Sequence, residues 1–149
     1  MPGTLSHGAP DVNVLICAHR AESPDHERYA EWLRALAESD QPFAVSELGC
    51  SAFVRIVTHT KIWAEPTSID DALKFIAALR GRRNARSLTH GPGSWEVFAR
   101  RCTGARARGK LVADAYHAAL AIDHGCEFAT ADGDFARFAE LRWQHPLRN

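Results

Sequence analysis

Four acidic residues, far apart along the chain, are candidates for holding a divalent cation. They are Asp11, Glu47, Asp114 and Asp132. Hard cations such as Mg²⁺ prefer oxygen ligands, and proteins hold them with one or two carboxylates together with waters and substrate phosphates. An ion held in this way lowers the pKa of a bound water and neutralises charge that develops on a phosphate. The four acids therefore indicate phosphodiester chemistry with Mg²⁺ or Mn²⁺, if the fold brings them together.

Two of these acids follow short apolar runs that are typical of buried strands. Glu47 comes just after the run at 43–45, and Asp132 and Asp134 come just after the run at 126–130. In an open parallel sheet, functional groups gather where strands end at their carboxyl edge. We therefore expect these carboxylates at one edge of a sheet.

The other two acids flank apolar segments. Asp11 precedes the segment 12–18, as though the chain were just leaving a strand, and Asp114 lies near the start of an alanine-rich helix expected at 111–124. A carboxylate on a largely buried helix is costly unless it is paired or bound to metal. Taken singly, each acid is more simply explained as a helix N-terminal charge or a solvated loop residue. The hypothesis rests on all four together.

The elements that must position these acids alternate between helix and strand. Ser68 with Asp71 resembles a capping box, and Gly81 and Gly125 each follow a stretch of helical periodicity. Short apolar strands between helices predict a parallel sheet covered on both faces, in an α/β domain. We expect helices at 24–38, 48–58, 69–80, 94–103 and 111–124, and strands at 43–45, 85–89, 126–130 and 141–143.

Length and composition predict one soluble domain that spans residues 1–149. The chain is 46% hydrophobic, which is enough for one sizeable core. It has no apolar run of membrane-spanning length, and its first ten residues lack the features of a secretory signal, so we expect a cytoplasmic protein without a membrane partner. The four cysteines are irregularly spaced with no CxxC pair, which favours reduced thiols.

The net charge is zero, but the basic residues are unevenly distributed. Between Arg80 and Lys110 nine basic residues face one acid, Glu96, and the rest of the chain balances this excess of eight. Such a run is either a solvated face or a surface for a phosphodiester substrate. Arg106, Arg108 and Lys110 directly precede the helix of Asp114, so we predict that they bind RNA phosphates; a purely solvated loop is the alternative.

Several segments of the chain form an ordered set of motifs. They are 11–16 (DVNVLI), followed by Ala18 and His19, then 53–59 (FVRIVTH), 111–115 (LVADA), 130–135 (TADGDF) and the ending 135–147. In this order they resemble the motifs of PIN-domain nucleases, and among these the mycobacterial-type VapC toxins. The likeness covers about residues 11–147, and the ordered set is far more specific than any one motif.

This resemblance implies a fold and a set of site residues. The fold would be a three-layer α/β/α sandwich with a central parallel sheet, in which the acids converge on Mg²⁺ or Mn²⁺. Asp11 and Asp114 would be the main metal ligands, and Glu47 and Asp132 would complete a catalytic quartet. Three further residues, Asn13, Thr130 and Asp134, would support these carboxylates without being the main ligands.

Two features depart from the family pattern. Many PIN domains place the second acid three residues before the motif arginine, which here would be Ala52. Glu47 lies eight residues before Arg55, so its place in the quartet follows from the subfamily alone. At the amino end, His7–Pro10 replaces the apolar strand that normally precedes the first aspartate, which indicates a short strand or an altered terminus.

The resemblance implies an endoribonuclease toxin that cleaves structured RNA, such as tRNA or rRNA. It also implies two partners, a VapB-like antitoxin that inhibits the enzyme and a second copy of the chain in a homodimer. Three alternatives stay open because fold does not fix function. They are a PIN nuclease of DNA or RNA processing without an antitoxin, an inactive nucleic-acid-binding module, and a metal-dependent hydrolase of small phosphoesters.

Overall fold

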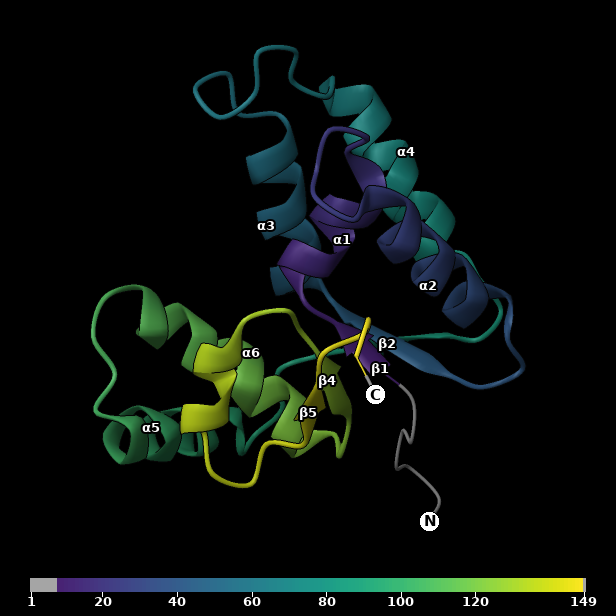
Figure 1. Cartoon of the computed structure of the whole chain (residues 1–149). Helices are drawn as coiled ribbons and strands as arrows, with labels where there is room; N and C mark the ends of the chain where they lie inside the picture. Colours follow the sequence, from purple (N-terminus) through teal and green to yellow (C-terminus); the bar gives the residue numbers. More distant parts are fainter. Residues whose placement is uncertain (1–7, 149) are drawn as a thin grey trace.

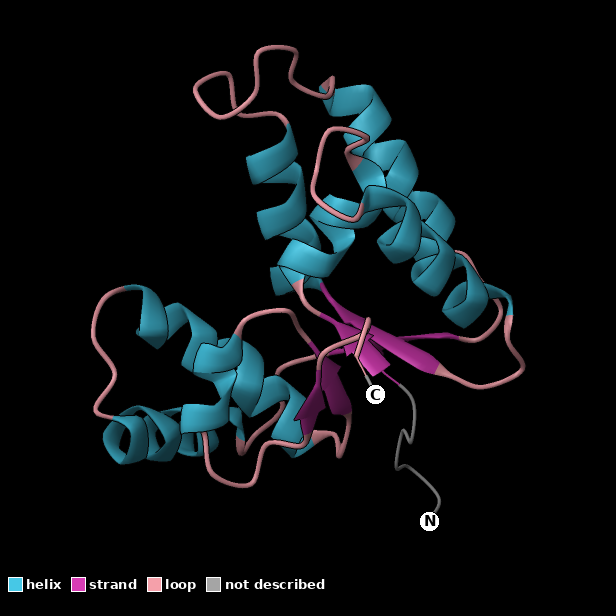
Figure 2. Cartoon of the chain, viewed as in Figure 1, coloured by secondary structure: helices cyan, strands magenta, loops and turns pink. Residues whose placement is uncertain are grey.

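Five short strands separate two groups of helices in the computed structural model, which describes residues 8–148 (Figures 1 and 2). Helices α1 to α4 lie on one side of the strands, and α5 and α6 lie on the other. The predicted α/β class, with three layers, is confirmed. The elements are β1 Gly8–Pro10, α1 Val12–His19, α2 His26–Glu38, β2 Phe43–Ser46, α3 Glu47–Val57, α4 Ile69–Arg80, β3 Ala85–Leu88, α5 Ser94–Ala105, α6 Lys110–Asp123, β4 Glu127–Ala129, the 3₁₀ helix η1 Gly133–Arg137 and β5 Trp143–Gln144.

All strand pairs are parallel, but the described strands form two hydrogen-bonded groups rather than one sheet. The order is β1-β4-β5 in one group and β2-β3 in the other. Asp11 donates its backbone N–H to Ala129 in β4, at 2.8 Å. Because N–H groups alternate sides along a strand, the nitrogen of Pro10 faces away from β4 and has no hydrogen to donate. The expected central sheet therefore lacks a backbone donor beside β1, and no hydrogen-bonded ladder joins β1 to β2 among the described strands.

Two apolar clusters hold the layers together. The first joins α1 to α4 to the strands through large side chains such as Phe43, Phe53 and Ile76. The second lies under α5, α6 and η1 and is rich in alanine, including Ala115 and Ala118, which are fully buried. Small side chains let α6 approach the sheet closely, which places the residues on its first turns beside the carboxyl ends of β1 and β4.

Side-chain caps fix where several helices begin. Ser46 accepts a hydrogen bond from Gly49 N at the start of α3, and Ser68 accepts one from Asp71 N at the start of α4, as the capping-box pattern predicts. The helix expected from Pro24 instead begins at His26. Its cap, Asp25, is in the left-handed conformation with φ 56°, so the chain turns once more before α2.

The amino end resolves one of the departures noted in the sequence. A strand does precede Asp11, and within the described residues it comprises Gly8–Pro10. Two elements were not predicted, the helix α1 directly after Asp11 and the short η1, and β5 lies at 143–144 rather than 141–143. Within the described residues, no helix is long and apolar enough to cross a membrane. All four cysteines are free.

Candidate functional site

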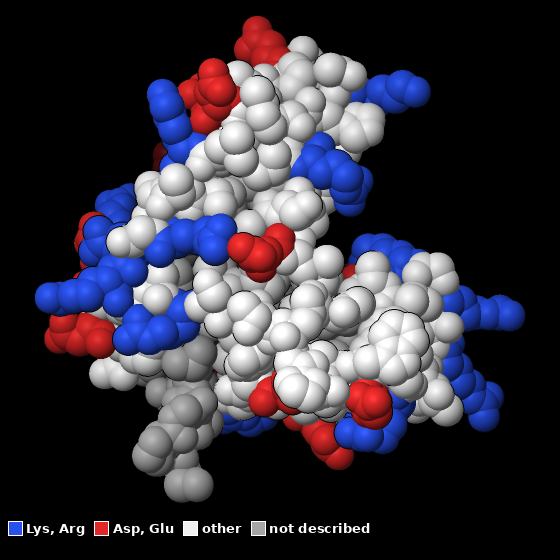
Figure 3. Space-filling view, turned by 180° about the vertical axis from the view of Figure 1, so that it is seen from behind, with Lys and Arg blue, Asp and Glu red and all other residues white. Residues whose placement is uncertain are grey.

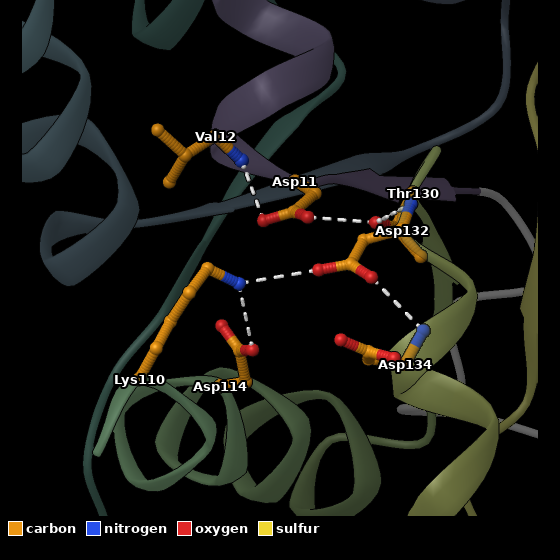
Figure 4. A network of polar contacts seen from close by, with 7 residues as sticks. All are labelled: Asp11, Val12, Lys110, Asp114, Thr130, Asp132 and Asp134. Carbon is orange, nitrogen blue, oxygen red and sulfur yellow. Dashed lines mark hydrogen bonds and ion pairs between the residues drawn. The ribbon is translucent and has the colours of Figure 1, made fainter.

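Three of the four predicted acids lie around one pocket at the carboxyl ends of β1 and β4 (Figure 4). Asp11 follows β1 directly, Asp132 follows β4, and Asp114 projects from the second turn of α6. The pocket has a volume of about 240 Å³. Its walls come from α1, α3 and α6, with the lining residues Asp11, Val12, Asn13, Ile16, Ala52, Arg55, Ile56, Lys110, Ala113, Asp114, His117 and Asp132.

Asp11 is the most enclosed of these acids, with 7% of its surface exposed. One carboxylate oxygen accepts a hydrogen bond from Val12 N at 2.7 Å and so caps α1; the other accepts one from the Thr130 hydroxyl, also at 2.7 Å. Burial raises the pKa of Asp11 from 3.8 to about 6, against the lowering effect of these hydrogen bonds. Among residues 8–148, Asp11 is in no ion pair. A buried carboxylate without a cationic partner is typical of a functional site.

Thr130 ties the two strand ends together. Its side chain is fully buried, and its hydroxyl donates to Asp11 while accepting a hydrogen bond from Asp132 N at 3.0 Å. Asp132 in turn accepts a hydrogen bond from Asp134 N at 2.9 Å, which caps η1. Thr130 therefore positions two carboxylates, whereas the contact of Asp134 with the site runs through its backbone.

Lys110 closes the outer side of the pocket. Its ammonium group lies 3.0 Å from Asp114 Oδ2 and 3.2 Å from Asp132 Oδ2 (Figure 4). The hydrogen bond to Asp114 raises the pKa of Lys110. Gly109 precedes this residue with φ +55° and ψ −125°, a conformation that favours glycine, and it thereby sets the direction in which α6 begins. Lys110 was predicted to bind RNA, but in this structure it bridges two acids.

The donor set suits a hard divalent cation. Three carboxylates line the pocket, and Asn13 adds an amide oxygen that is buried without a hydrogen-bond partner in the described structure. Oxygen ligands of this kind match Mg²⁺ or Mn²⁺. In their present positions, however, no three His, Cys, Asp or Glu side chains within residues 8–148 are grouped closely enough to hold an ion. The pocket therefore has oxygen ligands of the right chemical kind for Mg²⁺ or Mn²⁺, but two of its carboxylates are paired with Lys110.

Glu47 is the predicted acid that stands apart. It begins α3 immediately after β2, but its side chain is 75% exposed and pairs with Arg80 at 3.3 Å. The pocket lining, as far as the described chain defines it, does not include Glu47. The structure thus brings together Asp11, Asp114 and Asp132 and leaves the fourth carboxylate outside.

The basic residues between 80 and 110 do not form one surface. Arg82, Arg83 and Arg86 line a separate depression, together with Glu38 and Asp40. Arg106 and Arg108 are exposed between α5 and α6, before the helix that carries Asp114. In Figure 3, basic side chains border both sides of a hollow between the upper and lower parts of the molecule. The charge excess is therefore divided, and one part stands near the acidic pocket.

Two residues in the pocket wall were not predicted as part of the site. Arg55 on α3 faces the pocket opposite α6, and His117 lies one turn beyond Asp114. Burial lowers the pKa of His117, which favours its neutral form. The i, i+3 spacing of His117 from Asp114 was visible in the sequence, but it is too common to identify a site. Arg55 lies in the segment 53–59, which resembles a family motif, but the sequence did not assign a role to its side chain.

Comparisons with known proteins agree on one family. The sequence profile of the PIN domain matches residues 9–141. Ribonuclease VapC43 of Mycobacterium tuberculosis is 39% identical over 137 residues, which cover 92% of this chain and 93% of that protein.

Solved structures share the fold at lower identity. VapBC2 from Rickettsia felis, solved bound to a DNA fragment from its promoter, aligns with a TM-score of 0.67 and 14% identity, over 93% of this chain and 97% of that one. VapC20 of M. tuberculosis, described as a toxin that cleaves the sarcin–ricin loop, aligns with a TM-score of 0.60 and 18% identity, over 91% and 99%. These alignments show that the chain shares its fold with the two solved structures.

Proposed function

The chain belongs to the PIN-domain family, among the VapC ribonucleases, and we propose that it is a metal-dependent endoribonuclease toxin that acts in the cytoplasm on structured RNA. One observation carries the proposal. Asp11, Asp114 and Asp132, separated by up to 121 positions in the sequence, line one pocket together with Asn13, whose buried amide oxygen has no hydrogen-bond partner within residues 8–148. The relatives' names support ribonuclease activity, and the pocket supplies carboxylates suited to it.

The three acids have different roles in the proposed reaction. Asp11 and Asp114 are the main ligands of Mg²⁺ or Mn²⁺, and Asp132 orients the attacking water. A bound divalent ion would lower the pKa of that water and neutralise charge on the phosphate. Thr130 holds the side chain of Asp11 and the backbone of Asp132 in fixed positions. Asp11 therefore requires little rearrangement when an ion binds. Asp134 stabilises Asp132 through its backbone N–H.

Basic residues around the pocket bind the RNA backbone. Arg106 and Arg108 stand exposed before α6, and Arg55 on α3 lines the pocket itself. Contacts with phosphates position RNA without reading its sequence. VapC20, a structural relative, is described as cleaving the sarcin–ricin loop, and this supports structured RNA as the substrate class.

A cognate VapB-like antitoxin inhibits the enzyme in this proposal, and two copies of the chain form a homodimer. The support for the antitoxin is the structural likeness to VapBC2, a toxin–antitoxin pair. Expression of the chain alone should arrest growth, and co-expression of a short neighbouring reading frame should restore it. Growth arrest that no neighbouring frame relieves would favour a processing nuclease without an antitoxin.

Cleavage of RNA by the purified chain tests the activity. We expect cleavage with Mg²⁺ or Mn²⁺ and none with EDTA, and loss of both cleavage and Mn²⁺ uptake in Asp11→Asn and Asp114→Asn. The matched control is Asp70→Asn, because Asp70 is exposed at the start of α4 and outside the pocket. Sequencing the 5′ ends of RNA fragments after brief induction would identify the target. Full activity in Asp11→Asn would contradict the proposed site.

A further inference from the structure

Lys110 occupies a position that helix energetics does not favour. It is the first residue of α6, whose first turn contains no acidic residue. The N-terminus of a helix carries partial positive charge, so a lysine there is unfavourable. A lysine four residues before an aspartate is also the weaker order for an ion pair along a helix. The local sequence therefore does not account for a cation at this position.

The contacts across the pocket do account for it. The Lys110 ammonium contacts Asp114 on its own helix and Asp132 from the distant β4–η1 connection. The exposed fraction of its side chain is 74%, compared with 12% for Asp114 and 24% for Asp132. The ammonium thus covers two enclosed carboxylates from the solvent side, which is the side from which an ion must enter.

From this geometry we propose that Lys110 is a resident cation of the acidic pocket, which holds Asp114 and Asp132 in the metal-free protein and leaves them when a divalent ion binds. The inference rests on the proposed metal-dependent function. It explains why the acids lie together while no three of them, within the described residues, are arranged to hold an ion. One oxygen of Asp114 and one of Asp132 face the ammonium group, which occupies the place between them.

The displacement is physically inexpensive. The Lys110 side chain is 74% exposed and its four-carbon stem is flexible, so its ammonium group stays hydrated when it leaves the two carboxylates. A divalent ion bound to the same oxygens would repel the ammonium group strongly at such short range. Lys110 therefore competes with the metal, and once displaced it stands at the pocket mouth where an RNA phosphate would lie. The predicted contact of Lys110 with an RNA phosphate would then form after the divalent ion has displaced Lys110 from the two carboxylates.

Titration of the metal-free full chain with Mn²⁺, followed by calorimetry, tests this inference. Lys110→Met should bind Mn²⁺ about 3- to 10-fold more tightly than the wild type, because the two ion pairs of the exposed ammonium group no longer compete. Lys110→Arg keeps the charge and should bind like the wild type. Two controls remove other cations: Lys74→Met on α4, and Arg108→Met, two residues before Lys110 in the sequence but outside the pocket lining. Both should change Mn²⁺ affinity less than twofold.

A second readout separates competition from a merely structural role. In EDTA, Lys110→Met should melt at a lower temperature than the wild type, because Asp114 and Asp132 lose their shared cation. With Mn²⁺ its melting temperature should rise more than that of the wild type, while RNA cleavage at saturating Mn²⁺ falls because a phosphate contact is lost. Opposite changes in metal affinity and cleavage are the signature of the proposed role.

The possible failures are distinguishable. Unchanged or weaker Mn²⁺ binding by Lys110→Met would overturn the inference and leave the metal site intact. An equal increase in Mn²⁺ affinity in Arg108→Met would also overturn the inference, because the overall loss of positive charge would then explain the tighter binding. No Mn²⁺ uptake by any variant or by the wild type would overturn the proposed metal site itself, and the role of Lys110 with it.

Discussion

The inner and outer halves of the acidic pocket are held in different ways. In the inner half, the backbone N–H of Val12 and the buried hydroxyl of Thr130 fix Asp11, and no cation pairs with it among the described residues. In the outer half, the exposed ammonium of Lys110 holds Asp114 and Asp132. The two donors of Asp11 belong to a rigid scaffold and cannot leave it, whereas the flexible side chain of Lys110 can leave Asp114 and Asp132. The difference indicates a preformed inner half and an outer half that rearranges when a ligand binds.

The largest expected effect is on cleavage, and it should differ between the halves. Asp11→Asn should reduce RNA cleavage about 1,000-fold or more, because several kcal/mol of metal-dependent stabilisation are lost and each 1.4 kcal/mol is a factor of ten. Asp132→Asn, in the outer half, should cost about 10- to 100-fold on the same scale. Initial rates at saturating Mn²⁺ measure both.

Stability provides the control for this pair of variants. Asparagine also caps helices, so Asp11→Asn should keep α1 and should melt no lower than the wild type in EDTA, since it removes a buried charge. Equal losses of cleavage in the two variants would show that the halves do not differ in function.

The next largest effect is a dependence of stability on pH that arises in the inner half. The pKa of Asp11 is about 6 in the folded metal-free protein and 3.8 ordinarily, so between these values the folded state binds more protons than the unfolded state. Stability from this group is fully present below pH 3.8 and is lost as the pH rises through 6. The difference between the two pKa values corresponds to roughly 3 kcal/mol.

Urea unfolding in EDTA from acidic to neutral pH measures this loss. Other groups titrate in both proteins, so the difference between the wild type and Asp11→Asn isolates Asp11, and the variant should lack the decline. Mn²⁺ should remove the decline from the wild type, because a metal ion stabilises the ionised carboxylate. A constant difference between wild type and variant across the pH range would refute the burial cost assigned to Asp11.

The sequence predicted the fold class, most element positions and three of the acids that line the pocket, because these depend on local pattern. Alternating apolar runs identify strands and helices without any knowledge of distant contacts. The carboxylates then follow from their places at strand ends and on an apolar helix. The missing ladder between the described strands β1 and β2 also has a local contribution from Pro10, which the prediction of a central sheet did not include.

The links between residues far apart in sequence were beyond such patterns. Thr130 reaches Asp11 across 119 positions, and Lys110 reaches Asp132 across 22. A hydroxyl or an ammonium group has no periodicity that reveals its partner, and its contacts depend on how the two layers of helices approach the sheet. Lys110 therefore looked like a phosphate ligand in the sequence, while the structure pairs it with two acids.

A smaller effect should come from the residue that connects the halves. Thr130→Val preserves shape but leaves one oxygen of Asp11 without its donor and the N–H of Asp132 without its acceptor. We expect a loss of about 1–3 kcal/mol in unfolding free energy, because the unsatisfied groups are buried. The pKa of Asp11 should rise further, since this hydrogen bond lowers it.

Thr130→Ser keeps the hydroxyl and is the matched control. It should retain Mn²⁺ affinity and cleavage near the wild type, whereas Thr130→Val should lose both in part. Chemical unfolding and Mn²⁺ titration of the two variants provide the comparison. If serine proved as harmful as valine, the methyl group rather than the hydrogen bonds would be what Thr130 contributes.

The smallest expected effect belongs to Glu47, which stands outside both halves. To act as the fourth acid, its carboxylate must leave Arg80, which lies 3.3 Å away, and turn toward the pocket. An exposed carboxylate contributes about 1 kcal/mol or less, so Glu47→Gln should reduce cleavage about tenfold at most and leave the melting temperature unchanged. Arg80→Gln frees Glu47 and should not reduce cleavage. Unaltered cleavage in Glu47→Gln would restrict the site to three acids, and a loss equal to that of Asp11→Asn would place Glu47 within the inner half.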